Sequence, residues 1–521
     1  MMQSPSANRV QNSYLHSSKE RDRATSTKVT AGIIRHAITL ALLSASLLIT
    51  GQAVQAQEIV LANFGGSPDG ANPESRLTSY GGNLYGTTHG GGLGSGTVFE
   101  LTPDGSGGWN ENVIYNFCSL SSCADGANPT YSYVIFDSSG NLYGTAYAGG
   151  ANGYGAVFEL SPSGDSWTEK VLYSFANTPD GANPVNGLIV DSSGNLYGTT
   201  WSGGKSGNGT VYELTQSGGV WKDKVISNIK STYSGLTMNA HGNIFGTTYN
   251  SVFEMTPNGK GGWQGSTILS FTSGTNASKY GSNPNGTPAF DSAGNLYGTT
   301  YGGGTNGNGA VYELTPGTTG WTPKVLYEFG TEGSHPLAGV LLDSAGNVYG
   351  TTTQGGKLGD GNVFELVPPK STGAYAHKVL FAFDGPHGND PYGSMIMDSN
   401  GYLYGTTYLG GTNGVGSVFE VSPKAVATTT HLTSSVNPST QGEAVTFTAT
   451  VSSSNGPPPD GEMIAFECCG GTIGSAPLMS GVAKFTTSTL PTGKTNIQAV
   501  YFGDLNFKTS TSNTVSQVVN P

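Results

Sequence analysis

The chain has 521 residues, of which 11% are charged, 10% are aromatic and 81 are glycine, and its formal net charge at pH 7 is −12. This charge argues against a nucleic-acid-binding protein, because phosphate backbones are bound by clustered basic side chains. So much glycine, without long helical stretches rich in Ala, Glu, Lys or Leu after residue 56, is typical of an all-β protein with many turns. The length predicts two domains.

The first 56 residues have the features of a secretory signal peptide. Basic residues between positions 9 and 35 precede an apolar run over 37–49, and residues 54–56 (Val-Gln-Ala) give a cleavage pattern. The apolar run is too short for a bilayer-spanning helix, although an uncleaved membrane anchor is the alternative. Removal of residues 1–56 takes away six of the 22 basic and two of the 34 acidic residues, which leaves a net charge of −16 and Arg76 as the only arginine. We therefore expect a secreted or cell-surface protein with no transmembrane segment in its mature chain.

A seven-residue motif, Gly-Asn-Leu-Tyr-Gly-Thr-Thr, recurs with small variations through the middle of the chain. Its seven copies, spaced by 48 to 58 residues, begin at Gly82, Gly140, Gly194, Gly242, Gly294, Gly346 and Gly401. Each copy lies in a unit of four short segments that read as strands bounded by turn residues. A period near 52 with four antiparallel strands is typical of a propeller blade. The sequence therefore predicts a seven-bladed β-propeller over residues 57–423.

Several positions that recur in the units are expected to be structural. The Asp of each Asp-Ser-(Ser/Ala)-Gly-Asn turn suits an Asx-turn better than a metal site, because each turn offers one carboxylate only. The glycine inside the second strand indicates close backbone approach or a bend. The glutamate of the third strand recurs in every unit, whereas an active site needs only one or two carboxylates. The tryptophans before the fourth strand are expected to pack between units, with a sugar-stacking rim as the alternative.

The repeated stretch Gly-Asn-Leu-Tyr-Gly-Thr-Thr, followed by Gly-Gly-x-x-x-x-Gly-x-Val-Phe-Glu-Leu, resembles the tandem GloVer repeats of exported bacterial proteins. The resemblance covers about 365 residues. It implies export and attachment to varied C-terminal modules. It implies no known activity and no catalytic residue.

The last part of the chain has a different pattern. After a polar linker at 424–430, residues 431–521 alternate between apolar and polar types, as in Ala-Val-Thr-Phe-Thr-Ala-Thr-Val from Ala444, which predicts a β-sandwich of roughly seven strands. The runs Gly481-Val-Ala-Lys-Phe485 and Ala499-Val-Tyr-Phe-Gly-Asp504 are similar to bacterial Ig-like repeat domains. That similarity implies a spacer or an adhesive module.

Two further structural predictions concern the N-terminal strand and the cysteines. The segment from Glu58 to Phe64 has the pattern of a fourth strand but precedes the first complete unit, so we expect it to complete the last blade. Cys118 and Cys123 flank a short loop in an exported protein, where a disulfide can persist, and we expect them to be paired. The neighbouring residues 468 and 469 are also cysteines, and their state stays open.

The sequence indicates no cofactor, metal site or catalytic residue, since it has no zinc-binding His motif, phosphate loop or nucleophile elbow. We expect a non-catalytic, monomeric binding or structural protein, with the propeller as a recognition platform for an extracellular glycan or cell-surface component. The alternative is an extracellular polysaccharide-active enzyme, a lyase or a glycoside hydrolase, built on the propeller.

Recognition is expected on the face where two classes of loop emerge, those from the outer strand to the next blade and those between the second and third strands. The candidate ligand contacts are Trp201 and the aspartates of three Asp-Gly-Ala-Asn-Pro loops, Asp69, Asp125 and Asp180. The alternative is that these loops are only Asx-turns and glycine linkers. The fourth copy turns directly after Tyr249, so we expect a notch in the face there.

Overall fold

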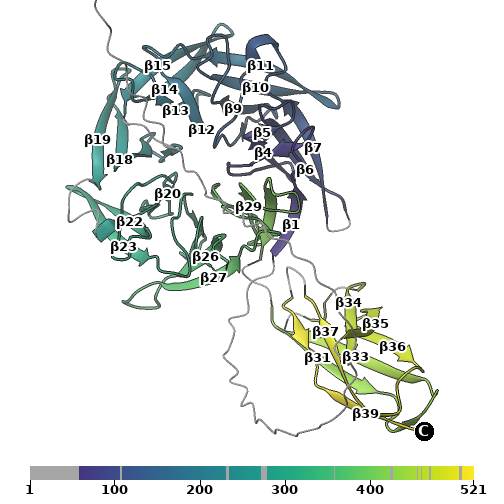
Figure 1. Ribbon diagram of the computed structural model, residues 1–521. Helices are drawn as coiled ribbons and strands as arrows, with labels where there is room; N and C mark the ends of the chain where they lie inside the picture. Colours follow the sequence, from purple (N-terminus) through teal and green to yellow (C-terminus); the bar gives the residue numbers. More distant parts are fainter. Residues whose placement is uncertain are drawn as a thin grey trace, which may run out of the picture. The chain divides into compact units, whose positions relative to one another are not determined.

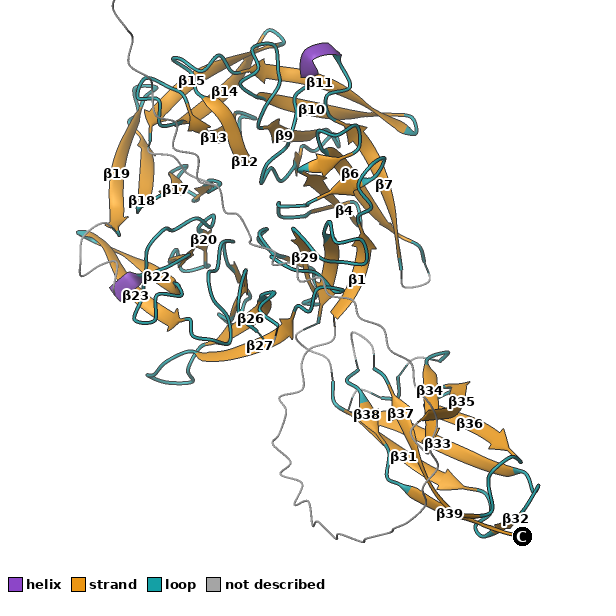
Figure 2. Cartoon of the chain, viewed as in Figure 1, coloured by secondary structure: helices purple, strands orange, loops and turns teal. Residues whose placement is uncertain are grey.

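The computed structural model describes residues 58–521, apart from 106–107, 230–233, 272–278, 357, 423–425, 455, 459, 469–470 and 504–506. The predicted signal peptide lies outside the described residues. Strands dominate the described chain, and short helical turns such as η1 (Ser121–Cys123) join some of them (Figure 2). The predicted all-β fold class is confirmed.

Seven four-stranded antiparallel sheets follow one another along residues 58–421 and form a ring (Figure 1). The first sheet in chain order contains β3 (Thr78–Tyr80), β4 (Asn83–Thr88), β6 (Thr97–Pro103) and β7 (Trp109–Asn116). The second contains β8 (Ile135–Phe136), β9 (Leu142–Ala146), β10 (Ala156–Ser163) and β11 (Ser166–Ser174). The third contains β12 (Ala182–Val190), β13 (Leu196–Ser202), β14 (Thr210–Ser217) and β15 (Val220–Asn228). Each sheet contains one copy of the motif, so each copy builds one blade.

The next three sheets repeat the same order of strands. They are β16 (Thr237–Met238), β17 (Ile244–Thr248), β18 (Ser251–Pro257) and β19 (Trp263–Ser270); β20 (Ala289–Phe290), β21 (Leu296–Thr300), β22 (Ala310–Gly317) and β23 (Gly320–Glu328); and β24 (Leu341–Leu342), β25 (Val348–Thr352), β26 (Asn362–Val367) and β27 (Ala376–Ala382). The motif forms the second strand of every sheet.

The seventh sheet closes the ring with the N-terminal strand. Its order is β1 (Glu58–Asn63), β30 (Ser417–Val421), β29 (Leu403–Thr407) and β28 (Ile396–Met397). Strand β1 pairs antiparallel with β30, with Val60 opposite Phe419 and Asn63 opposite Ser417. Phe64, directly after β1, is fully buried beside Leu77 and Val418. The predicted closure by the N-terminal segment is confirmed.

The glycine inside each second strand makes room for an aromatic ring on the third strand. A Cβ atom at Gly144 would lie 2.5 Å from the Phe158 ring, and one at Gly298 would lie 2.3 Å from the Tyr312 hydroxyl. Contacts below 3.0 Å cannot be accommodated without a shift of the neighbour, so these positions require glycine. The sequence predicted close backbone approach or a bend at these glycines, and the group that approaches them is a side-chain ring.

The tryptophans, which were expected before the fourth strands and lie at their beginnings, pack between blades. Trp167 meets the Tyr85 ring of the preceding blade at 6.4 Å between centroids, and Trp263 meets Tyr197 at 5.8 Å, both edge to face. Such contacts add to the burial of each blade against its neighbour. The packing role is confirmed.

The first threonine of the motif links one blade to the next in every blade except the fourth, where the Thr247 hydroxyl has no partner in the described chain. The hydroxyl of Thr145 donates to the carbonyl oxygen of Asn186 at 2.7 Å. The hydroxyl of Thr406 donates to the carbonyl of Ser75 at 2.9 Å, which joins the last blade to the first. These buried bonds tie the innermost segments together around the axis.

The C-terminal part forms two sheets around its own core. The three-stranded sheet contains β31 (Thr428–Ser434), β33 (Val445–Ser453) and β36 (Val482–Thr487), and the six-stranded sheet contains β32 (Ser439–Thr440), β39 (Val515–Asn520), β37 (Gly493–Tyr501), β34 (Met463–Cys468), β35 (Gly471–Pro477) and β38 (Ser510–Thr511). Phe447, Phe466 and Ile497 are fully buried between the sheets. Strand β31 begins within the predicted 424–430 linker, and the domain boundaries otherwise stay a prediction.

The described chain contains no helix with the length and apolarity needed to cross a bilayer.

Candidate ligand-binding site

The two classes of loop meet on one side of the ring, as predicted. In the first blade, β2 (Gly70–Ala71) of the loop from the preceding blade pairs with β5 (Gly90–Gly91) of the loop between the second and third strands. Isolated bridges join the same two loops in other blades, as between Ala127 and Ala148 or Ser334 and Gln354. These pairings form the loop face of the propeller.

The three candidate aspartates brace the loops that carry them. Asp125 is fully buried, and its Oδ2 accepts hydrogen bonds from the Tyr115 hydroxyl and the Ser119 amide, both at 2.8 Å. Asp180 accepts from the Tyr173 hydroxyl at 2.7 Å. Asp69 accepts from two amide groups of its own loop. The structure does not bring these aspartates together, because each lies in a different loop between blades.

Each of these aspartates has a second acid beside it on an outer strand. Burial, and then the neighbouring carboxyl of Asp69, raise the pKa of Glu111 to about 8. Burial and the carboxyl of Asp180 raise the pKa of Asp223 to about 7. Glu169 beside Asp125 has a pKa of about 7 for the same reasons. Near neutral pH the carboxyl groups of Glu111, Glu169 and Asp223 are therefore at least partly protonated. The sequence did not indicate this property.

Trp201, the fourth candidate, belongs to a set of equivalent positions that follow the motif on the loop face. We name this set the rim positions: His89, Tyr147, Trp201, Tyr249, Tyr301, Thr353 and Tyr408. Six of the seven carry an aromatic ring or an imidazole. Asparagine side chains of the next blade hold the rim backbone, because the Asn128 amide donates to the His89 carbonyl and the Asn183 amide to the Tyr147 carbonyl, both at 3.1 Å.

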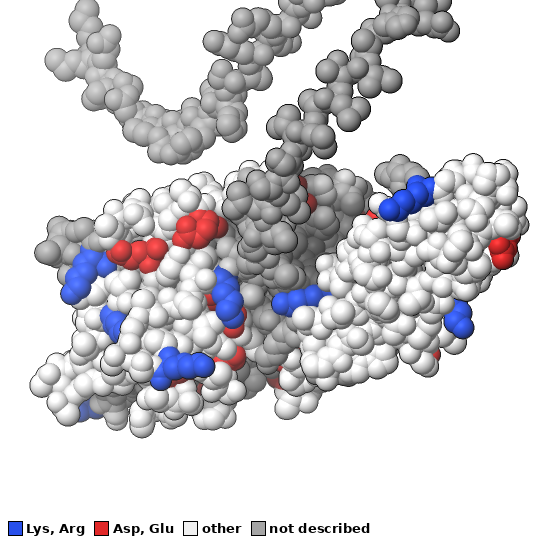
Figure 3. All heavy atoms as spheres, turned by 90° about the horizontal axis from the view of Figure 1, so that it is seen from below, with Lys and Arg blue, Asp and Glu red and all other residues white. Residues whose placement is uncertain are grey.

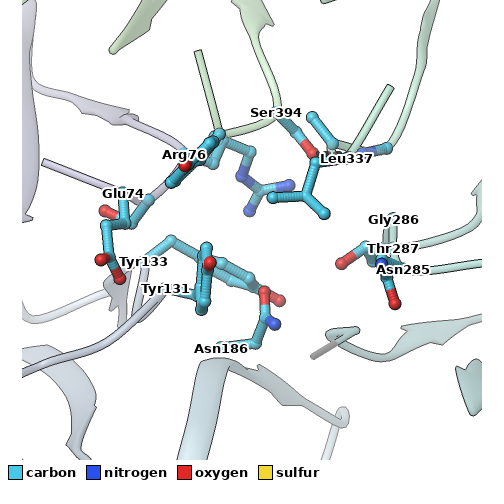
Figure 4. A pocket seen from close by; sticks show the side chains of 15 residues that line it. Glu74, Arg76, Tyr131, Tyr133, Asn186, Asn285, Gly286, Thr287, Leu337 and Ser394 are labelled. Atoms are coloured by element: carbon cyan, nitrogen blue, oxygen red, sulfur yellow. Dashed lines mark hydrogen bonds between the residues drawn. The ribbon is translucent and has the colours of Figure 1, made fainter. Parts of the chain in front are cut away.

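An axial pocket lies inside the ring and takes its walls from most of the blades (Figure 4). Its volume is about 40 Å³, and it is lined by Arg76, Tyr133, Asn186, Thr287, Leu337 and Ser394 among others. These residues come from the segments that lead into the innermost strands. Seven positions are equivalent in the repeats, namely Arg76, Tyr133, Gly187, Gly235, Thr287, Gly339 and Ser394, and all of them except Gly187 and Gly235 line the pocket.

Arg76 places its guanidinium group in this pocket. The Cζ atom lies 4.2 Å from the centroid of the Tyr133 ring, a cation–π contact. The Nε atom is buried and has no hydrogen-bond partner in the described chain. Figure 4 shows the guanidinium pointing toward the space between Tyr133 and Leu337, while the carboxyl group of Glu74 points away from it. The pocket therefore contains one fixed positive charge.

Aromatic side chains join the pocket to the rim positions. Tyr392, which lines the pocket, stacks on Tyr408 with ring centroids 5.0 Å apart and an angle of 18° between the rings. Tyr131, also in the pocket wall, lies 6.4 Å from the Tyr392 ring. These half-buried rings lead from the pocket to the rim position of the seventh blade.

Glu74 and His89 lie beside each other at the edge of the pocket. The Nδ1 atom of His89 is 3.8 Å from Oε1 of Glu74. Burial raises the pKa of Glu74 to about 7, and burial lowers the pKa of His89. Both shifts favour the uncharged forms, so Glu74 is only partly ionised near neutral pH, and its carboxyl group points away from Arg76.

The carboxylates that recur in the blades have structural partners. Oδ1 of Asp191 accepts from two amide groups of its own turn, and Oδ2 accepts from the Tyr197 hydroxyl at 3.0 Å. Glu213 accepts from the same hydroxyl at 3.2 Å and pairs with Lys224 at 2.9 Å. On the surface seen in Figure 3, charged residues are few among the uncharged ones. In the described part of the chain, no three His, Cys, Asp or Glu residues are grouped so that they could hold a metal ion.

The remaining predictions concern a loop and a turn. Cys118 and Cys123 form a disulfide in the structure, in the loop that contains η1. Cys469 lies outside the described residues. At the short turn between Thr248 and Ser251 there is a hollow of about 450 Å³ lined by Asn250 and Phe253, where the notch was expected.

The axial pocket was not among the predicted sites. The sequence signal was present, because Arg76 is the only arginine after residue 35 and stands where three repeats have glycine. That signal appears only when the residues before the first strand of each repeat are aligned.

Comparison with known structures gives distant likenesses. The extracellular domain of a putative hybrid two-component system from B. thetaiotaomicron is 15% identical, with a TM-score of 0.43, 89% of this chain covered and 58% of that chain. The extracellular domain of a putative one-component system from the same organism is 12% identical, with a TM-score of 0.48, 90% of this chain covered and 58% of that chain. This chain therefore spans less than two thirds of those domains.

A third structure is an ulvan lyase of polysaccharide lyase family PL25, which is 13% identical, with a TM-score of 0.42, 70% of this chain covered and 95% of that chain. Likenesses at these scores do not bear on function. No curated protein matches the chain.

Family models match both parts of the chain. The model of the bacterial Ig-like domain (group 3) matches residues 432–520. The model of the Gloeobacter/Verrucomicrobia repeat matches residues 94–252 and 248–456, which together make up more than half of the chain. The protein is therefore a member of the Gloeobacter/Verrucomicrobia repeat family with a C-terminal bacterial Ig-like domain.

Proposed function

We propose that the chain is an exported, monomeric and non-catalytic binding protein whose propeller recognises an extracellular glycan at the axial end of its loop face. The Ig-like domain serves as a spacer or an adhesive module. Export is supported by the predicted signal peptide and by the Cys118–Cys123 disulfide, since such bonds persist in oxidising compartments.

The observation that carries this proposal is the stack of Tyr392 on Tyr408 beside a polar pocket. Sugar-binding sites combine aromatic faces with a few convergent polar groups, and the pocket supplies such groups from Asn186, Thr287 and Ser394. The ring holds these residues rigidly, because the threonine bonds join the innermost segments on which they lie.

A glycan array with the full chain, followed by calorimetry on the best ligand, tests the proposal. Tyr408→Ala is expected to weaken binding at least tenfold, as an aromatic contact of about 1.5 kcal/mol requires. Tyr249→Ala is the matched control, because Tyr249 is the rim position of the fourth blade and is 62% exposed. Trp201→Ala shows whether contact extends to the third blade. Equal loss in both tyrosine variants, or none in either, contradicts the proposal.

The alternative, a polysaccharide lyase or glycoside hydrolase, has one observation in its favour. Glu74 has a pKa of about 7 and lies 3.8 Å from His89, so it can give or take a proton near neutral pH. Incubation of bound glycans with the protein should release neither reducing ends nor unsaturated sugars. Release that is lost in Glu74→Gln would establish the enzyme instead.

A further inference from the structure

We infer that the axial pocket receives the carboxylate group of an acidic sugar, with the guanidinium group of Arg76 as its partner. This inference deepens the proposed glycan-binding function and rests on it. It names the chemical class of the ligand.

The charge of Arg76 is uncompensated in the described chain. An arginine side chain stays protonated in proteins, and buried polar groups are nearly always hydrogen-bonded. Nε of Arg76 is buried without a partner, and no carboxylate oxygen in the described chain lies within 4.0 Å of its guanidinium. The ring of Tyr133 contacts its face only and leaves the edge of the guanidinium, with its N–H donors, free for an acceptor.

The composition of the pocket around that charge favours an anionic group. Apart from Arg76 itself and Glu74, which points away, the side chains that line the pocket are neutral. Asn186, Thr287 and Ser394 are among them. An anionic group entering this space meets a cation and hydroxyl or amide groups, with no acid facing it. The guanidinium fork matches the two oxygens of a planar carboxylate, a geometry that a lysine cannot offer.

The size of the axial pocket limits which part of a ligand can enter it. A cavity of about 40 Å³ has room for a few water molecules, at about 10–15 Å³ for each. It therefore admits a carboxylate group but no sugar ring. The ring of a uronic acid would stay outside, where Tyr392 and Tyr408 offer aromatic faces. A uronic acid is thus a ligand that uses both the pocket and the stacked tyrosines.

Nuclear magnetic resonance of the full chain labelled with ¹⁵N-arginine gives a direct test. The sequence has five arginines, and Arg76→Lys identifies the Nε–H signal of Arg76 by its loss. Glucuronate and galacturonate are expected to shift this signal with saturation, whereas glucose and galactose leave it in place. No shift with either uronate, or an equal shift with glucose, overturns the inference. A shift with inorganic sulfate but with neither uronate reassigns the pocket to a sulfated ligand and overturns it too.

Binding measurements separate this inference from the proposed function. Arg76→Gln should weaken binding of an acidic glycan at least tenfold, and chemical reduction of the glycan's carboxyl groups should do the same to the unaltered protein. Lys205→Gln, which removes an exposed cation of the loop face, is the matched control. Thermal melting of each variant shows whether it is folded, and the comparison of the native with the carboxyl-reduced glycan uses the unaltered protein alone.

Two outcomes distinguish the failures. If glycans bind but neither Arg76→Gln nor carboxyl reduction weakens them, the carboxylate assignment is wrong and the proposed function stands. If no glycan binds but uronates still shift the Arg76 signal, the glycan-binding function is wrong and the pocket is a site for small carboxylates.

Discussion

Two sets of equivalent positions recur in the seven sheets, and they differ in how much their residues vary. One set is the aromatic residue in the second strand of each blade. The other is the residue near the axis at each innermost strand. The first set consists of Tyr85, Tyr143, Tyr197, Phe245, Tyr297, Tyr349 and Tyr404. The second consists of Arg76, Tyr133, Gly187, Gly235, Thr287, Gly339 and Ser394. Six members of the first set are the same residue, whereas the second set contains five residue types.

The environments explain the difference. Members of the first set pack against an aromatic ring of the next blade and bond carboxylates of their own, as Tyr197 does with Trp263 and Asp191. The blades meet a common requirement there, so six of the seven have the same residue. The axial residues share one space. Only the combined volume of their side chains must fit that space, so the residue can differ from blade to blade. Recognition is therefore expected where the repeat is irregular.

The dependence of stability on pH should give the largest effect and should separate two sets of carboxylates. Burial raises the pKa of Glu111 to about 8 and that of Asp223 to about 7. These groups stay protonated in the folded chain when their unfolded forms have ionised. Their contribution is complete below about pH 4 and is lost as pH rises to 7 or 8, at less than about 1.4 kcal/mol per pH unit for each group, because both are only partly buried.

The turn aspartates act in the opposite direction. Burial alone would raise the pKa of Asp137, but hydrogen bonds from Asn141 and its turn outweigh burial and lower it. That stability is present above about pH 4 and is lost as pH falls below it. Thermal melting from pH 3 to 9 should therefore show a maximum near pH 4 to 5. In Asp223→Asn the decline toward pH 8 should be shallower, and an unchanged slope would contradict the assignment.

Removal of the Phe64 ring tests closure of the ring, which depends on a single N-terminal strand. Phe64→Ala is expected to lower the free energy of unfolding by about 3–5 kcal/mol, because the ring is fully buried and packs edge to face on Phe99. Urea unfolding followed by tryptophan fluorescence measures it. Leu93→Ala is the control, since Leu93 is 67% exposed. A loss below about 1 kcal/mol would show that closure contributes little.

Much of the fold could be predicted from the sequence, because the repeat compares equivalent positions within one chain. The motif gave the four strands of each blade, and the unpaired pattern after Glu58 gave the closing strand. The need for glycine and the packing of the tryptophans also followed, since each depends on a local pattern that the repeat multiplies. The C-terminal β-sandwich was predicted from alternation and its Ig-like character from the resemblance, and its two-residue strands β32 and β38 were beyond these signals.

The candidate site could be predicted only in part. Rim residues such as Trp201 follow the motif directly and were found. The aspartates were selected for their charge, but Asp125 is turned inward by Tyr115 and Ser119, which the sequence separates from it by several residues. Arg76 and Thr287 face one another only when the ring is closed, so no local pattern brings them together.

Addition of a methyl group to a motif glycine tests the repeated set directly. Gly144→Ala places a Cβ atom 2.5 Å from the Phe158 ring and should cost about 1–3 kcal/mol of unfolding free energy. Phe158→Leu in the same chain should recover part of that loss by making room. If Gly144→Ala alone is neutral in urea unfolding, the glycine is not kept for close approach.

The smallest effect expected is at the threonines that join the blades, and there the chain contains its own control. Thr145→Val leaves the buried carbonyl of Asn186 without its donor at 2.7 Å, which should cost about 1–2 kcal/mol. The equivalent Thr247 of the fourth blade has a buried hydroxyl with no partner in the described chain. Thr247→Val should therefore be neutral or slightly stabilising, because an unpaired hydroxyl is replaced by a methyl group.

The two threonine variants, compared by their urea midpoints at one pH, decide whether the bond or the shape of the side chain matters. Valine has nearly the shape of threonine, so a loss due to packing alone would be equal at both positions. A loss at Thr145 only assigns the second residue of Gly-Thr-Thr to joining the blades. Equal losses would mean that the fourth blade is joined like the others, and the threonine would then belong with the packing residues of the repeat.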